Sequence, residues 1–301
     1  MREGAHGADA RSTRVETHEG AVQHTEPSHG RRVLSRRQVL TWLAASGLGI
    51  VLGRGALSVY THRIEHVTAA LPGLRSPMRA AWLCDMHVGA FVRGGSVERW
   101  IDDTIDLGPD VVLLGGDLVD ALVPSDHAGL LTQLSRLHAP LGVYAVWGNH
   151  DTVRFRGQRA RFERELAAHG VTVLQNRGVR VRDDLFIAGL DDLRTGRPDL
   201  SAALEERPAQ GACVLLSHNP DVLPDVPVDV GLTLCGHTHG GQVRLPWLGP
   251  IRTSSRYGQR FASGWVEGPA RGYVSRGLGV TQVPLRINCP PELTALRLEP
   301  G

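Results

Sequence analysis

Five short apolar runs in this chain are each followed at once by side chains of the kind that bind metal ions. Each run has the length of a strand buried on both faces. The runs cover residues 80–84, 111–114, 143–147, 213–216 and 232–235. The side chains that follow them, in chain order, are Asp85 and His87, Asp117, Asn149 and His150, His218, and His237 and His239. Because the carboxyl ends of strands in an α/β sheet meet at one edge, we expect these side chains to share one pocket.

The size and charge of the chain limit what it can be. With 301 residues, of which 42% are hydrophobic, it can bury a core large enough for one catalytic domain with a short extra segment. A formal net charge of +2 gives no support for a protein that holds nucleic acid by bulk charge. No specific nucleic-acid partner is therefore indicated.

The four cysteines lie in or beside apolar runs and include no C-x-x-C pair. This placement favours small buried side chains over disulfides or a zinc knot. They are Cys84, Cys213, Cys235 and Cys289.

The N-terminal part of the chain has the composition of a disordered tail followed by a targeting signal. Residues 1–34 are polar and without apolar periodicity, which predicts a disordered tail. The segment 35–60 opens with Ser-Arg-Arg-Gln-Val-Leu and continues into an uncharged apolar run over 41–52. This pattern resembles a twin-arginine export signal, which is either cleaved or kept as a membrane anchor. We therefore expect the export machinery as a partner and a location in the cell envelope or outside the cytoplasm.

The remaining residues, 61–301, alternate apolar strands with helical stretches and form the predicted catalytic domain. A helix is expected from Ser96, as its N-cap, to Leu107, with Ile105 on the buried face. The charged stretch 159–169 predicts an amphipathic helix. Two runs, 171–174 and 185–188, read as strands at the start of a second sheet.

The stretch from Pro246 to Gly272 is rich in Gly, Pro, Arg and aromatic residues and predicts a long loop region. Long loops inside a compact domain are often functional. The residues leave open a substrate lid, a membrane-facing surface, or a loop that is only packed or solvated.

The pattern D-x-H, G-D, G-N-H-D, H and G-H-x-H occurs here in order between residues 80 and 240. As a set it resembles the calcineurin-like metallophosphoesterase superfamily, in particular its bacterial twin-arginine-exported or membrane-anchored phosphodiesterases. The resemblance implies an α/β fold, a four-layer αββα sandwich of two mixed β-sheets flanked by helices, with a dimetal site at the strand ends. It also implies that Asp85, His87 and His239 hold one metal, that Asn149, His218 and His237 hold the other, and that Asp117 spans both.

The same resemblance implies a mechanism for hydrolysis of a phosphoester. His150 would not bind metal but would assist the leaving group or stabilise transition-state charge, and Asp120 would orient Asp117. Two divalent ions, two carboxylates and a bridging hydroxide leave a charge of about +1, which a phosphodiester monoanion neutralises. The metal-bridging hydroxide would attack phosphorus in line. Manganese, iron and zinc all accept this ligand set, so the identity of the two ions stays open.

The substrate class rests on analogy. The run 116–122 lacks the phosphate-binding Arg of the protein Ser/Thr phosphatases, which argues against a phosphoprotein. The similar bacterial enzymes include some that split UDP-diacylglucosamine, so an envelope or lipid-linked phosphodiester or pyrophosphate is the expected substrate. The alternatives are an exported nuclease of the same superfamily and a metal-binding envelope protein without turnover.

Overall fold

In the computed structural model, residues 36–92, 94–120 and 127–301 are described. The predicted tail 1–34 and the first residue of the predicted signal segment lie outside this part of the chain. By their internal contacts the residues form two units, Met1–Ala44 and Ala45–Gly301. Of the first unit the structure describes the beginning of helix α1 (Arg36–Ser58). Among the described residues, no helix meets the length and apolarity needed to cross a bilayer.

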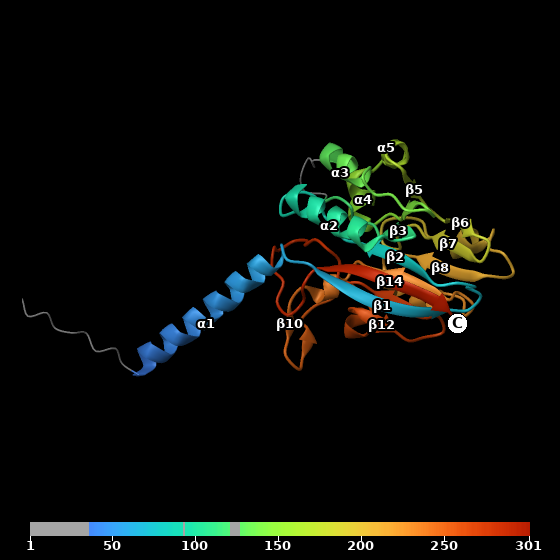
Figure 1. The fold of residues 1–301 in the computed structure, drawn as a ribbon. Helices are drawn as coiled ribbons and strands as arrows, with labels where there is room; N and C mark the ends of the chain where they lie inside the picture. The colour runs from blue at the N-terminus through green and yellow to red at the C-terminus, as the bar shows by residue number, and fades with distance from the viewer. Residues whose placement is uncertain (1–35, 93, 121–126) are drawn as a thin grey trace, which may run out of the picture. The chain divides into compact units, whose positions relative to one another are not determined.

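Two six-stranded sheets form the second unit (Figure 1). The first sheet has the order β1-β14-β2-β3-β4-β5, and the second has the order β12-β13-β9-β8-β7-β6. The strands of the first sheet are β1 (Arg63–Leu71), β2 (Met78–Leu83), β3 (Val111–Leu114), β4 (Val143–Ala145), β5 (Val171–Val173) and β14 (Glu292–Pro300). Those of the second are β6 (Arg177–Arg182), β7 (Leu185–Gly189), β8 (Ala212–Leu216), β9 (Leu232–Cys235), β12 (Gly264–Val266) and β13 (Gly272–Val274). A separate pair, β10 (Arg244–Leu245) and β11 (Gly249–Pro250), forms a small hairpin.

Both sheets are mixed. In the first, β2, β3, β4 and β5 run parallel, while β14 lies between β1 and β2, parallel to the former and antiparallel to the latter. In the second, β13, β9, β8 and β7 run parallel, and the edge strands β12 and β6 are antiparallel to their neighbours. The parallel strands share one direction, so the turns at their carboxyl ends gather at one edge of each sheet.

The buried side chains define the order of the layers. Along β3, Val111 and Leu113 point into a core shared with β8 and β9 of the second sheet, whereas Val112 and Leu114 point into a core shared with helices. On the far side of the second sheet, Phe186 packs with Ala203 and Val222. The predicted four-layer αββα sandwich is therefore confirmed.

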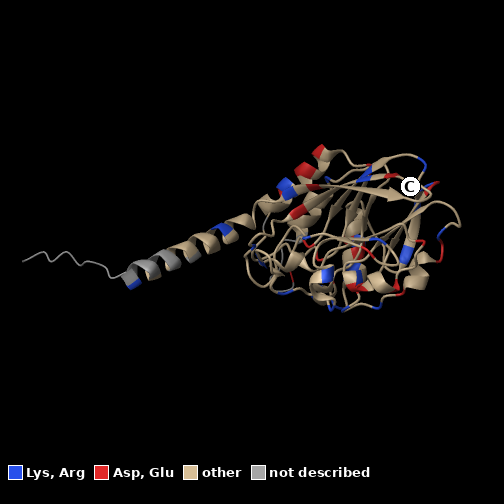
Figure 2. Ribbon diagram, turned by 90° about the horizontal axis from the view of Figure 1, so that it is seen from below, with Lys and Arg blue, Asp and Glu red and all other residues tan. Residues whose placement is uncertain are grey.

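Helices cover the outer faces of the two sheets. Over the first sheet lie α2, α3 and α5 (Figure 1). The bounds are α2 (Gly94–Leu107), α3 (His127–Leu134), α4 (Asn149–Arg154), α5 (Arg159–Ala168) and α6 (Leu200–Leu204), with the 3-10 turns η1 (Pro220–Asp225), η2 (His239–Gly241) and η3 (Gly258–Phe261). Charged residues of both signs are interspersed over this unit in Figure 2, in line with the small net charge of the whole chain.

Three local predictions are corrected. Helix α2 begins at Gly94, so Ser96 lies inside it, and Ile105 is 43% exposed because the buried face passes through Ile101 and Thr104 instead. Strand β5 is the edge of the first sheet, and the second sheet begins with β6. The stretch 246–272 is not one long loop, since it contains β11, η3 and β12 and buries Phe261.

Candidate metal centre

Five of the candidate ligands stand on sharp turns directly after strands β2, β3 and β9. These five have a positive backbone angle φ, which residues other than glycine rarely adopt: Asp85 (54°), His87 (47°), Asp117 (50°), His237 (70°) and His239 (52°). Each such residue costs about 1–3 kcal/mol and persists only where its surroundings hold it. Backbone bonds do so here, because the N–H of Asp85 donates to Gly116 (3.0 Å) and that of His87 donates to Asp117 (2.9 Å).

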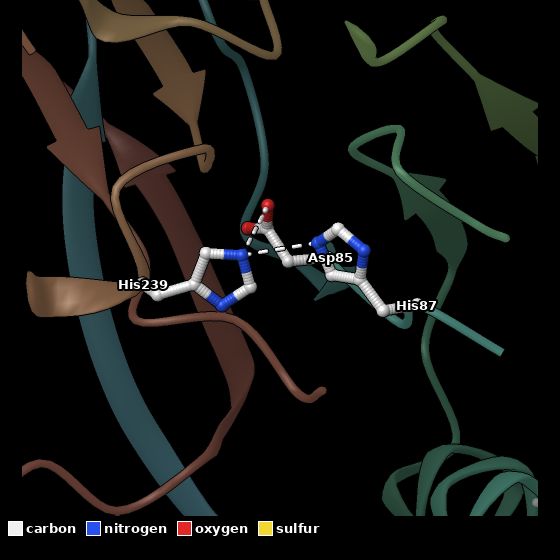
Figure 3. Close-up of side chains that lie close together, drawn as sticks. All are labelled: Asp85, His87 and His239. Atoms are coloured by element: carbon white, nitrogen blue, oxygen red, sulfur yellow. Dashed lines mark hydrogen bonds and ion pairs between the residues drawn. The ribbon is translucent and has the colours of Figure 1, made fainter. Parts of the chain in front are cut away.

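One group of potential ligands consists of Asp85, His87 and His239 (Figure 3). The Nε2 atoms of the two histidines lie 3.0 Å apart, and Nε2 of His239 lies 3.5 Å from Oδ1 of Asp85. All three side chains are buried. The two imidazoles thus direct the same ring atom toward one point beside a carboxylate.

A second group consists of Asp117, His218 and His237. Nε2 of His218 lies 3.2 Å from Oδ2 of Asp117 and 3.2 Å from Nδ1 of His237. Nδ1 of His218 lies 2.8 Å from the carbonyl oxygen of Gly115. A carbonyl only accepts hydrogen bonds, so Nδ1 carries the proton and Nε2 is the atom free to bind metal.

Asp117 lies between the two groups. Its Oδ2 is 3.5 Å from Nε2 of His87 in the first group as well as 3.2 Å from His218 in the second. Its Oδ1 accepts a hydrogen bond of 2.7 Å from the backbone N–H of His150. The carboxylate is therefore held in the position from which it could serve both groups.

Asn149, His150 and Asp120 complete the predicted set. Asn149 begins α4, and its side-chain oxygen is buried. The ring of His150 packs edge-on against that of His87, with 4.6 Å between the centroids. Asp120 was expected beside Asp117, and the structure places its Oδ2 4.0 Å from Nδ1 of His87, on the ring side away from the ligand atom. All the predicted site residues are thus brought to one place.

Burial and charge set the protonation of the first group. Burial lowers the pKa of His87 to about 3 and that of His239 well below its ordinary value, the latter aided by His87 and Arg286. Burial also raises the pKa of Asp85 to about 6. The imidazoles are therefore neutral and able to donate lone pairs.

In the second group burial and charge act in opposite directions. Burial alone raises the pKa of Asp117 and lowers that of His218, but their mutual attraction prevails. The pKa of Asp117 falls well below its ordinary value and that of His218 rises well above it. Burial, together with neighbouring charges such as those of His218 and Arg194, lowers the pKa of His237 to about 3.

The residues fit two divalent ions. Among the described residues, the buried Oδ1 of Asn149 has no hydrogen-bond partner. Buried polar atoms without partners are costly and call for an explanation. Carboxylate oxygen, amide oxygen and neutral imidazole nitrogen are ligands that divalent transition metals accept.

Three further residues shape this centre without having been predicted to do so. The buried carboxylate of Asp151 accepts backbone bonds from Gly148 (3.1 Å), Leu118 (2.9 Å) and Val119 (3.2 Å), which ties the turn after β4 to the turn after β3. Burial and the charge of Asp117 raise its pKa to about 7. The motif position of Asp151 was visible in the sequence, but its bonding was not.

The second and third unpredicted residues are both arginines. Arg286 is 1% exposed, and its Nη2 lies 3.4 Å from Nδ1 of His239 while it donates to the carbonyl oxygens of Gly277 and Gly279. Arg194 is exposed, yet it lines the same cavity as His239 and lies close enough to His237 to influence its pKa. No periodicity or motif in the sequence marks either arginine as part of a site.

A cavity of about 1040 Å³ opens beside the ligands. His239 and Thr238 lie in its wall together with Arg194, Arg252, Ile251 and Val283. The wall therefore carries three arginines, the carboxylates of Asp221 and Asp225, and apolar side chains.

A family model for calcineurin-like phosphoesterases matches residues 78–241, a range that holds all the predicted ligands. The chain belongs to this family. Calcineurin-like phosphoesterases use divalent metal ions, and the two ligand groups agree with that chemistry. The chain is thus a dimetal phosphoester hydrolase.

Relatives span most of the chain. It is 32% identical over 283 residues to the uncharacterized metallophosphoesterase YkuE of Bacillus subtilis, which covers 88% of this chain and 98% of the relative. It is 32% identical over 246 residues to the phosphodiesterase YaeI of Escherichia coli, covering 78% and 87%. A transmembrane protein with a metallophosphoesterase domain from Danio rerio is 31% identical over 257 residues, covering 78% of this chain and 56% of that protein.

Proposed function

We propose that this phosphoester hydrolase is a phosphodiesterase that acts on an envelope or lipid-linked phosphodiester or pyrophosphate. The observation that carries the proposal is the cavity, whose wall joins the ligand His239 to the cationic Arg194 and to the apolar Ile251 and Val283. The relative named a phosphodiesterase supports the diester. A UDP-diacylglucosamine-like lipid combines the required pyrophosphate with apolar chains.

The proposed ligand assignment follows the two groups. Asp85, His87 and His239 hold one ion, and His218 and His237 hold the other, together with Asn149, whose side-chain oxygen is buried. Asp117 serves both, which its distances to His87 and His218 support. When bound, divalent ions activate water as a nucleophile and polarise the phosphoryl group. The ions are manganese, iron or zinc, all of which accept this ligand set.

The other residues bind, orient and move protons. His150 lies beside the ligands with its Nδ1 buried and unpartnered among the described residues, and we assign it the donation of a proton to the leaving alcohol. We assign Asp120 a positioning role at the ligands, since its Oδ2 lies 4.0 Å from Nδ1 of His87. Arg194, in the cavity wall, contacts those phosphate oxygens of the substrate that take no part in the reaction. Two ions and the carboxylates of Asp85 and Asp117 give the centre a charge of about +2, which favours an anionic substrate.

The proposal also concerns location and domain boundaries. Residues 35–60 act as a twin-arginine signal or membrane anchor, and residues 61–301 as the catalytic domain. The paired arginines, the apolar run after them and four buried free cysteines that need no oxidation support export of a folded protein. Replacing Arg36 and Arg37 by Lys should leave the protein in the cytoplasmic fraction, while unchanged export would reject the signal.

The activity is tested with the purified full chain after loading with manganese, iron or zinc. Bis-p-nitrophenyl phosphate and p-nitrophenyl phosphate are compared side by side, with Asp117→Asn as the inactive control. Faster, metal-dependent cleavage of the diester is expected, and it should disappear in the control. Preference for the monoester would contradict the phosphodiesterase. Absence of any turnover with both ions bound would favour a non-catalytic metal-binding protein, and cleavage of DNA or RNA above all other substrates would favour the nuclease.

A further inference from the structure

The β10–β11 hairpin, which we define as residues 244–251, carries large apolar side chains that are exposed to solvent. Trp247 is fully exposed (103%), Leu248 is 69% exposed and Ile251 is 66% exposed. Trp247 also has a φ of 63°, in the left-handed region that bulky residues avoid. Contiguous exposed apolar side chains usually mark a surface that is covered by a partner.

The hairpin is held in place. Nε2 of Gln259 donates to the carbonyl oxygen of Leu248 (2.9 Å), and Nδ2 of Asn288 donates to that of Arg244 (3.1 Å). The backbone N–H of Arg244 donates to Ile287 (2.9 Å). The exposed side chains are therefore presented by a supported turn, so their exposure is a feature of the fold.

The charged side chains of the segment that carries the hairpin have one sign, although Asp221 lies against it and pairs with Arg256 (3.6 Å). Residues 242–261 contain four arginines and no Asp or Glu. Arg252 and Arg260 are exposed and form no ion pair with any described residue. Apolar and aromatic side chains flanked by unpaired arginines complement a bilayer surface with anionic headgroups, where Trp lies at the interface.

A second apolar element is attached to the same segment. The backbone N–H of Arg286 donates to Gly55 of α1 (3.0 Å), and Oγ of Ser58 donates to the carbonyl of Arg286 (2.6 Å). The adjacent Ile287 pairs with the start of β10. Leu57, in the last turn of α1, is 71% exposed. Residues 286–287 thus join the hairpin to the end of an apolar helix.

The cavity of the metal centre opens at this hairpin. Ile251 and Arg252 line it, as does His239 at the ligands. Val283, also in its wall, is 55% exposed. A surface that meets the hairpin would therefore meet the mouth of the cavity.

We propose that the β10–β11 hairpin docks on a phospholipid bilayer that carries anionic lipids and places the cavity mouth at the headgroups. Trp247 and Leu248 enter the interface, and Arg252 and Arg260 contact headgroup phosphates. The docking stands independently of the chemistry. Only its consequence, delivery of a lipid-linked phosphodiester from the bilayer, rests on the proposed function.

The test uses the full chain and vesicles of phosphatidylcholine with and without phosphatidylglycerol. Cosedimentation should be stronger with phosphatidylglycerol and should weaken with salt. Trp247→Ala combined with Leu248→Gln should weaken it by about tenfold or more. Val228→Ser is the matched control, because Val228 is 75% exposed but lies outside the hairpin and the cavity wall. Its binding should equal that of the original protein.

Brominated lipids report the depth of Trp247 directly. They should quench part of the tryptophan fluorescence, and Trp247→Phe should remove that part. Equal vesicle binding by the original protein and the double variant would overturn the proposal. So would a dimer that forms without vesicles and is lost in the double variant, since a second copy would then be the partner.

Turnover of soluble bis-p-nitrophenyl phosphate separates this proposal from the proposed function. The double variant should cleave the soluble diester at the original rate, because neither side chain lines the cavity. Loss of docking with retained turnover supports the docking surface. Docking without any turnover would refute the phosphodiesterase and leave the docking surface standing.

Discussion

Replacing Gly148 by Ala should disable the metal centre without touching a ligand. A Cβ at this position would lie 2.1 Å from Oδ1 of Asp117, whereas ordinary contact begins at 3.4 Å, so the atoms must separate by at least 1.3 Å. Gly148 itself has φ −98° and ψ 174°, a conformation that Ala adopts without strain. The obstacles to the methyl group are therefore both in Asp117: the carboxylate that serves both ligand groups, and the backbone nitrogen, which would lie 2.3 Å from the new Cβ.

The size of the effect follows from this displacement. A misplacement of about 1 Å in a catalytic centre costs about 100-fold in rate. Crowding of a buried site by one methyl group costs about 1–3 kcal/mol of unfolding free energy. We therefore expect the Gly148→Ala protein to remain folded, to bind less than its full complement of metal, and to lose about 100-fold or more in kcat/KM.

The assay compares metal content, thermal unfolding and kcat/KM for bis-p-nitrophenyl phosphate in two glycine variants. Gly95→Ala is the matched control, because its Cβ would meet only Nη1 of Arg99, at 3.9 Å. Gly95 lies in α2, where Ala should stabilise by about 0.5–1 kcal/mol and leave activity unchanged. A Gly148→Ala protein with both ions bound and undiminished kcat/KM would refute the proposed position of Asp117 as a shared ligand.

Three further predictions concern residues around the centre. Asp151→Ala leaves three backbone N–H groups without their acceptor, so urea unfolding should show a loss of about 3 kcal/mol or more; a loss under about 1 kcal/mol would mean that water replaces the carboxylate. Arg194→Ala should raise KM for the diester about tenfold with a smaller change in kcat, and an unchanged KM would remove Arg194 from the substrate site. Burial raises the pKa of Cys213 to about 11, so at about pH 8 its thiol stays protonated. A thiol reagent should therefore detect none of the four cysteines until the protein is unfolded, and rapid labelling of the folded protein would contradict their burial.

The strands were predictable because both of their faces are buried. Runs such as 111–114 are apolar throughout, and a parallel strand between two cores requires that composition. The helix predicted over 159–169 is confirmed as α5, and the buried, unpaired cysteines are confirmed as well. Placing the strand at 171–173 in the right sheet was not possible, because its own residues do not encode which neighbour it pairs with.

Helix ends and loops were less predictable. Ser96 has the chemistry of an N-cap, but α2 begins two residues earlier, and the amphipathic face turns away from Ile105 toward Thr104. The order of the stretch 246–272 comes from long-range contacts such as the pairing of β12 with β13. Local sequence patterns do not encode such long-range contacts, so the strand and the turn in this stretch could not be predicted.

The sequence indicated which residues lie near the site, but not which contacts they make with one another. The motifs predicted that Asp85, His218 and the other candidate ligands follow strands, and the fold brings these strand ends together. Asp120 shows the limit, since its spacing after Asp117 contains no information on its proximity to His87, where the folded chain places its Oδ2 4.0 Å from Nδ1. Arg286 shows a second limit, because its guanidinium is buried by carbonyl oxygens that only the folded loop assembles.

The position of β14 has a consequence for how the protein is made. The strand lies between β1 and β2, so the first sheet has a gap until residues 292–300 have left the ribosome. The segment before it supplies the guanidinium of Arg286 at His239 and the backbone bond of Gly279 to Asp85. The first sheet and these contacts can therefore form only after β14 and the segment before it have been synthesised. Truncation within the last strand should therefore abolish metal retention along with the fold.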